Sequence, residues 1–72
     1  MRTQIQATMN SLPVKTTVYK LEEYLQTSSL TPQEVLAAVA LLAARQISVL
    51  PAEAHDSAGD MFGSMVDIGL AL

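Results

Sequence analysis

The most extended apolar pattern of the chain runs through residues 32–49. Thr31, Pro32 and Glu34 match the N-cap, N1 and N3 positions of a capping box, which satisfies the free amides of a first helical turn. A proline disfavours helical geometry at the residue before it, so the helix should stop ahead of Pro51. The pattern therefore predicts a helix over residues 32–49.

Apolar residues at steps of three and four also occur on both sides of this segment. Residues 15–27 carry such a pattern and predict a second helix. Residues 51–72 predict a C-terminal helical segment, with a short first helix that leads to Gly59 and a last helix that Asp60 caps. In this last helix Gly63 lowers the helix propensity.

The N-terminal residues 1–13 carry the weakest pattern. Polar and less polar residues alternate over residues 2–7, which is the period of a short strand. A frayed N-terminal tail explains the same residues equally well, because chain ends are often poorly ordered. We therefore expect either a short strand or a flexible segment that ends at Pro13.

These elements predict an all-α fold in a single small domain, residues 1–72. The linker between residues 15–27 and 32–49 is short, so the two helices should form a hairpin, with the C-terminal helical segment added to it.

The helix over residues 32–49 is apolar nearly all round, which is typical of a buried central helix. A 72-residue chain cannot surround such a helix, so we expect an intertwined or face-to-face homodimer. Small side chains around a central leucine would allow two helices to approach closely. The predicted dimer interface consists of Ala37, Leu41, Ala44, Ser48 and Gln46. The Gln46 amide would pair across the dimer, or it would meet water if the last turn frays.

Composition narrows the possible functions. Half of the residues are hydrophobic and only 15% are charged, which excludes a disordered tail. With no cysteine and one histidine, a disulfide framework and a Cys/His zinc site are excluded as well. Residues 1–21 carry +3 and residues 22–72 carry −6, so an acidic body argues against phosphate binding.

The same sequence favours a soluble, cytoplasmic protein. It begins without the apolar stretch of a signal peptide, and its longest apolar run has ten residues, whereas a membrane span needs about 18. We expect no membrane association, no cofactor and no metal.

Only His55, Asp56 and Asp60 could be interpreted as a metal or acid–base cluster. Neighbouring helical positions diverge by about 100°, so His55 and Asp56 do not converge, and we expect all three on a surface loop. The glycines match neither the dinucleotide nor the P-loop spacing. The sequence therefore predicts no catalytic residue and no enzyme.

Methionine and phenylalanine are concentrated in the C-terminal segment. Methionine side chains adapt to irregular surfaces, so this segment could dock into a larger protein partner as a helix. The predicted partner-binding residues are Met61, Phe62, Met65, Val66, Ile68 and Leu70. The alternative is that they pack back on the first two helices and complete the core.

The function favoured by these observations is that of a small acidic protein–protein interaction module, an inhibitor or adaptor of a larger protein. In size and lack of catalytic groups the chain is similar to the small host-directed proteins of phages and mobile elements. The alternative is a DNA-binding regulator, because the chain resembles the ribbon-helix-helix repressors in residues 2–49. That resemblance implies that Arg2, Gln4 and Gln6 enter the major groove from an N-terminal strand.

Overall fold

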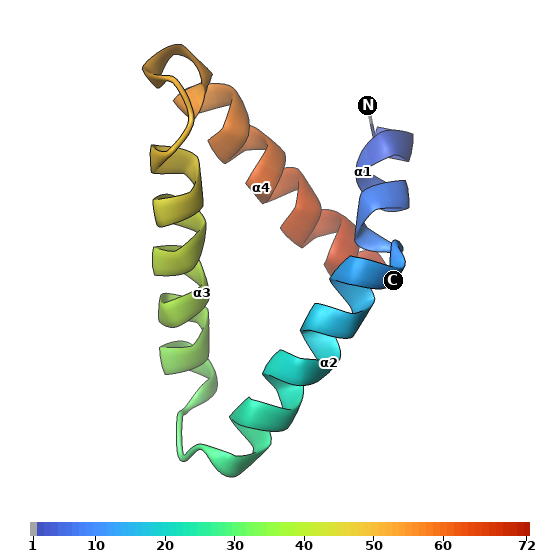
Figure 1. Ribbon diagram of the computed structural model, residues 1–72, viewed down its shortest axis with the longest axis vertical. Coiled ribbons are helices and arrows are strands. Elements are labelled where there is room, and N and C mark those ends of the chain that lie inside the picture. The colour runs from blue at the N-terminus through green and yellow to red at the C-terminus, as the bar shows by residue number, and fades with distance from the viewer. Residues whose placement is uncertain (1) are drawn as a thin grey trace. The chain divides into compact units, whose positions relative to one another are not determined.

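The computed structural model describes residues 2–72, with side chains from Thr3 onwards. The described elements are the helices α1 (Arg2–Met9), α2 (Leu12–Thr27), α3 (Pro32–Ser48) and α4 (His55–Ala71) and the short 3-10 helix η1 (Ala52–Ala54) (Figure 1). No strand occurs within these residues, so the predicted all-α class is confirmed. Contacts divide the chain into two compact units, Met1–Leu30 and Thr31–Leu72.

In the first unit, α1 replaces the strand predicted at residues 2–7, so that prediction is wrong. Glutamine and arginine are good helix formers, and three alternating pairs are too few to outweigh helix formation. The helical turn places Ile5 in a buried position with Met9 half-buried one turn later. The Thr8 hydroxyl donates to the Gln4 carbonyl at 3.1 Å, a bond that the helical geometry makes possible.

The second helix of this unit, α2, begins three residues before the predicted start at residue 15 and ends at the predicted Thr27. Pro13 lies within its first turn, where the missing backbone N–H of proline removes no helical hydrogen bond. The proline therefore belongs to the helix start and does not precede it. α2 contacts α1, and the Ser11 hydroxyl donates to the Thr8 carbonyl at 2.6 Å between them.

The second unit begins with the predicted capping box, which is confirmed. The Glu34 amide donates to the Thr31 hydroxyl oxygen at 3.2 Å, and the Thr31 amide donates to Glu34 Oε1 at 2.9 Å. α3 ends at Ser48, one residue before the predicted end, and the Leu50 amide donates to the Ile47 carbonyl at 3.0 Å. The start and end of α3 thus follow from local sequence signals.

Replacing the capping threonine tests how much the box stabilises α3. Thr31→Ala removes the acceptor of the Glu34 amide, and we expect the free energy of unfolding to fall by about 1 kcal/mol. Thr31→Ser keeps a hydroxyl at the same position and should retain most of the stability. Urea denaturation of the three proteins checks this; equal losses for both substitutions would contradict a capping role.

The C-terminal segment is one helix after η1, and the break predicted at Gly59 and Asp60 is absent. Both residues lie inside α4, so the prediction that Asp60 caps a separate helix is wrong. One glycine costs a helix about 1 kcal/mol, which a continuous packed face can offset. That face includes Ala58 and Phe62, which lie one turn apart on either side of the predicted break.

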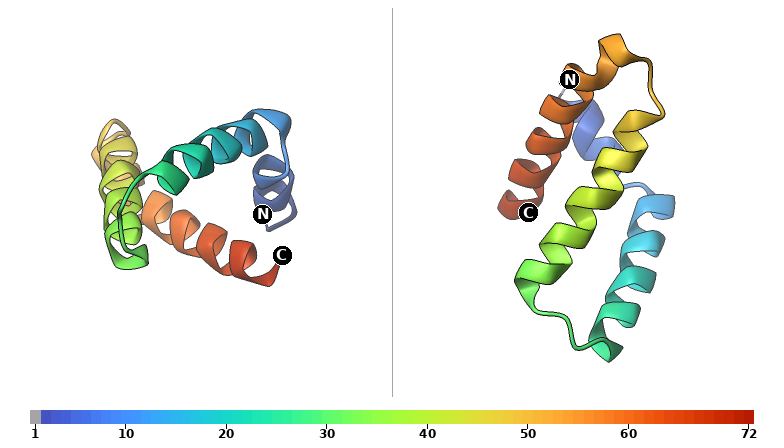
Figure 2. Two further views of the ribbon diagram at one scale, coloured as in Figure 1. Left: turned by 90° about the horizontal axis from the view of Figure 1, so that it is seen from below. Right: turned by 90° about the vertical axis from the view of Figure 1, so that its left-hand side faces the viewer.

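α4 pairs with α3 in this unit, and η1 also contacts α4. α3 leads into the connection that contains η1, α4 leads back out of it, and the two helices diverge away from this connection (Figure 1 and Figure 2). The sequence instead favoured a hairpin of residues 15–27 with 32–49. Those helices belong to different units, so that hairpin stays a prediction.

The glycines of α4 offer a way to strengthen the helix. A methyl group added at Gly59 or Gly63 would meet no other atom within 4 Å, and neither glycine has a positive φ. We expect Gly63→Ala to raise the free energy of unfolding by about 0.5–1 kcal/mol, since alanine restricts the unfolded chain and favours the helix. Gly59→Ala should add a similar amount. Thermal denaturation of the single and double variants checks this, and a lower midpoint would contradict it.

Candidate functional groove

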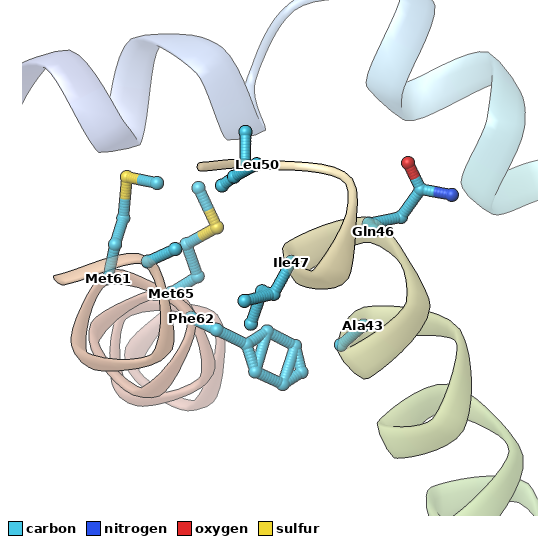
Figure 3. A pocket seen from close by; sticks show the side chains of 8 residues that line it. Ala43, Gln46, Ile47, Leu50, Met61, Phe62 and Met65 are labelled. Carbon is cyan, nitrogen blue, oxygen red and sulfur yellow. The ribbon is translucent and has the colours of Figure 1, made fainter. Parts of the chain in front are cut away.

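The second unit has an open apolar groove between α3 and α4, close to their connection (Figure 3). Its volume is about 310 Å³. The residues that line it come from the C-terminal end of α3, the following connection and the N-terminal half of α4. They are Ala43, Gln46, Ile47, Leu50, Ala58, Met61, Phe62 and Met65. We call this feature the α3–α4 groove.

The side chains that line the groove differ in burial: those at its floor are half-buried, and those at one edge are exposed. The Phe62 ring points from α4 toward Ile47 and Ala43, and all three side chains are half-buried (Figure 3). Met61 and Leu50 keep 43% and 41% of their surface exposed. Phe62 therefore joins the two helices, while Met61 and Leu50 remain available at the surface.

His55 fastens the connection at the end of the groove. Its Nε2 lies 2.9 Å from the Leu50 carbonyl oxygen, which can only accept, so Nε2–H donates this hydrogen bond. The imidazole is half-buried, as the first residue of α4. This places His55 in a structural role, whereas the sequence favoured a free surface loop for it.

The charges of α4 lie away from the groove. Asp56, Asp60 and Asp67 follow steps of four and seven and share one face of the helix. Phe62 and Met65 lie on the opposite face, because positions of the helix rotate by about 100° per residue. The groove is consequently lined by apolar side chains and one amide, so it favours apolar groups over ions.

The six residues predicted to bind a partner do not form one surface. Met61, Phe62 and Met65 line the groove. Ile68 is buried, with 1% of its surface exposed, and therefore belongs to the core as the alternative interpretation had it. Val66 and Leu70 lie outside the groove and are exposed, with Leu70 at 82%.

The five residues predicted for a dimer interface also separate. Ala37, Leu41, Ala44 and Ser48 are all exposed and fall on one stripe of α3 at steps of four, three and four. Gln46 instead lines the groove, and its amide points away from the groove centre (Figure 3). We call the stripe of four residues the α3 outer face. Gln46 is not part of it, and its place in a dimer interface stays a prediction.

Sequence reasoning missed the α3 side of the groove. Ala43, Ile47 and Leu50 follow steps of four and three, which is a helical face by itself. On a helix that is apolar nearly all round, however, this face does not stand out from the others. Ala58 was missed for another reason. The predicted break at Gly59 assigned Ala58 and Phe62 to different helices, whereas both lie on α4.

No group of three or more His, Cys, Asp or Glu side chains that could hold a metal ion occurs in the described part of the chain. Among the helices of residues 2–72, none combines the length and the hydropathy needed to cross a bilayer.

The resemblance to ribbon-helix-helix repressors depended on an N-terminal strand, and the structure has the helix α1 at these residues. Gln4 and Gln6, which that resemblance would place on a DNA-binding strand, lie on α1. The side chain of Arg2 lies outside the described side chains. A ribbon that enters the major groove is therefore absent from residues 2–72.

Comparisons with known protein families, with curated proteins and with solved structures find no match to this chain.

Proposed function

We propose that the protein is a non-enzymatic interaction module that binds a larger protein and acts as its inhibitor or adaptor. The α3–α4 groove is the single observation that carries this proposal. An apolar segment of the partner, in helical form, would lie between the two helices, as amphipathic helices lie in the grooves of other interaction proteins.

The side chains of the groove suit a protein ligand better than a small molecule. Small-molecule pockets add a few converging polar groups that fix the orientation of the ligand. Here Gln46 contributes the lone polar side chain, and its amide points away from the centre (Figure 3). Met61 and Met65 have flexible side chains, which can adapt to the irregular surface of a docked helix.

The arrangement of the two helices also favours a helical ligand. α3 and α4 lie closest at their connection and diverge away from it, so the groove opens between the end of α3 and the first half of α4 (Figure 1). Helices pack at interaxial distances of about 8–10 Å, so the apolar face of a third helix can lie in such an opening. The partner's anchor residues would then recur at steps of three and four.

Site-specific photo-cross-linking in the native cell tests this function. A photoreactive amino acid replaces Met61 at the groove edge or, as a matched control, Leu70, which lies on the same helix outside the groove and is more exposed. We expect one dominant protein adduct from position 61 and little from position 70. Mass spectrometry of the adduct should map the cross-link to an apolar helical segment.

Two results would overturn the proposal. Equal adduct patterns from both positions would indicate non-specific contact, and adducts formed only with a second copy would make the groove a self-association site. A Met65→Asp variant gives an independent check, since a carboxylate in the apolar groove should abolish the adduct from position 61.

A further inference from the structure

The α3 outer face is a helix face of the second unit that is left exposed by the rest of this unit. α3 contains no buried residue although it is apolar over most of its length. Leu41 lies in the middle of the outer face and keeps 60% of its surface exposed. Ala37 and Ala44 lie on either side of it, and their small side chains would allow another helix to approach closely.

The charges of α3 indicate what covers this face. α3 carries one acidic residue, Glu34, and one basic residue, Arg45. They are eleven residues apart, which corresponds to about three full turns, so both lie along the same edge of the outer face. Glu34 Oε1 accepts from the Thr31 amide, and its other carboxylate oxygen is left for a second bond.

We infer that a second copy of this chain covers the α3 outer face, with the two α3 helices antiparallel and a twofold axis close to Leu41. Such an axis, perpendicular to both helices, brings the same edge of each helix together in reversed order. Glu34 of one copy then faces Arg45 of the other, and the pair occurs twice. The charge order of this single helix is therefore complementary to itself.

The parallel arrangement lacks this complementarity. With the twofold axis along the helices, the edge that carries Glu34 and Arg45 faces the opposite edge of the partner helix. Gln33 and Ala40 lie on that opposite edge, and neither can neutralise a charge. Electrostatic complementarity selects the orientation in which two proteins associate. The antiparallel pair is thus the one that the sequence of α3 favours.

The packing register agrees with the charge register. When Leu41 lies opposite Leu41 of the second copy, Ala37 is offset by one residue, about 1.5 Å, from Ala44 of the second copy, so small residues lie near each other where the helices are closest. Glu34 and Arg45 of the second copy are then offset by three residues, or about 4.5 Å along the axis. The long arginine side chain can span this offset.

Cysteine cross-linking tests the orientation directly, because the chain contains no cysteine. Facing Cα atoms of two helices packed 8–10 Å apart are about 3.4–5.4 Å apart, which overlaps the Cα separations of disulfides. We expect Leu41→Cys to form a disulfide-linked dimer under mild oxidation. Leu36→Cys is the matched control, since Leu36 is 68% exposed and lies on another face of α3.

Two further positions separate antiparallel from parallel pairing. In the antiparallel dimer, Ala37→Cys and Ala44→Cys are each about 10 Å from their own copies along the axis, and only a mixture of the two should cross-link. In a parallel dimer each would cross-link alone. Self-linking of Ala37→Cys as fast as Leu41→Cys, or of Leu36→Cys as fast as Leu41→Cys, would overturn the inference.

Charge reversal and sedimentation complete the test on the full chain. The wild-type protein should sediment at twice its 7.7 kDa mass at micromolar concentrations. Arg45→Glu should weaken the dimer about ten-fold, since it creates two like-charge contacts, and Glu34→Arg with Arg45→Glu should restore it. A 7.7 kDa wild-type species, or an unchanged dimer in Arg45→Glu, would overturn the inference. Neither result bears on the groove, which lies on another face of α3.

Discussion

Ile68→Ala is expected to unfold a large share of the protein. Ile68 is the most deeply buried large side chain among the described residues, with 1% of its surface exposed. Truncating a buried isoleucine to alanine removes its apolar contacts and leaves a cavity, at a cost of about 2–5 kcal/mol. A domain of this size rarely has more than about 3–5 kcal/mol of stability, so this one change approaches the whole of it.

Leu70→Ala provides the matched control for this prediction. Leu70 lies two residues further along α4 and is 82% exposed, so its truncation should change the free energy of unfolding by less than about 0.5 kcal/mol. Far-ultraviolet circular dichroism during urea titration measures both variants. Similar losses for the two would contradict the assignment of Ile68 to the core.

Local signals in the sequence were sufficient for α3. The capping box of Thr31 and Glu34 acts within one helical turn, and Pro51 limits the end of the helix through its immediate neighbour. Features of this kind depend on residues within a few positions of one another. For that reason they could be predicted from the sequence and were confirmed in the structure.

The start of the chain and the C-terminal segment could not be predicted in this way. α1 forms where a short alternation indicated a strand, and it contacts α2, which the local pattern does not contain. Gly59 indicated a break, yet α4 passes through it. In the C-terminal segment the contacts of α4 with α3 outweigh the low helix propensity of glycine, whereas at the start of the chain the alternation is too short to outweigh helix formation.

The division of the predicted partner-binding residues has the same cause. Met61, Phe62, Met65 and Val66 are all apolar members of one helix, and the period of the pattern gives them similar weight. Which of them lines the groove depends on the side of α4 that meets α3. That rotation is a property of the helix pair and cannot be obtained from either helix alone.

The apolar side chains of α3 form two separate surfaces, and each surface has a different proposed role. One includes Ala43 and Ile47, contacts α4 and forms part of the groove. The other is the α3 outer face, which no residue of α4 covers and whose neighbouring charges favour a second copy. A dimer through the outer face would leave both grooves open, so self-association and partner binding can occur together.

Phe62→Ala and Met61→Ala are expected to separate packing from binding within the groove. Phe62 is half-buried and its ring points toward Ile47 and Ala43, so its truncation should lower the free energy of unfolding by about 2 kcal/mol, less than for a fully buried phenylalanine (Figure 3). Met61 is 43% exposed, and its truncation should cost less than about 1 kcal/mol.

At equal concentrations of folded protein, Met61→Ala should reduce partner binding more than Phe62→Ala does. Met61→Ala shortens a side chain at the open edge of the groove, so we expect it to reduce the adduct formed from a photoreactive residue at Met65 while the helical signal is retained. Urea titration and quantitative cross-linking measure the two effects on the same samples. If Met61→Ala were as destabilising as Phe62→Ala, the groove edge would belong to the core, and its role as a docking surface would have to be abandoned.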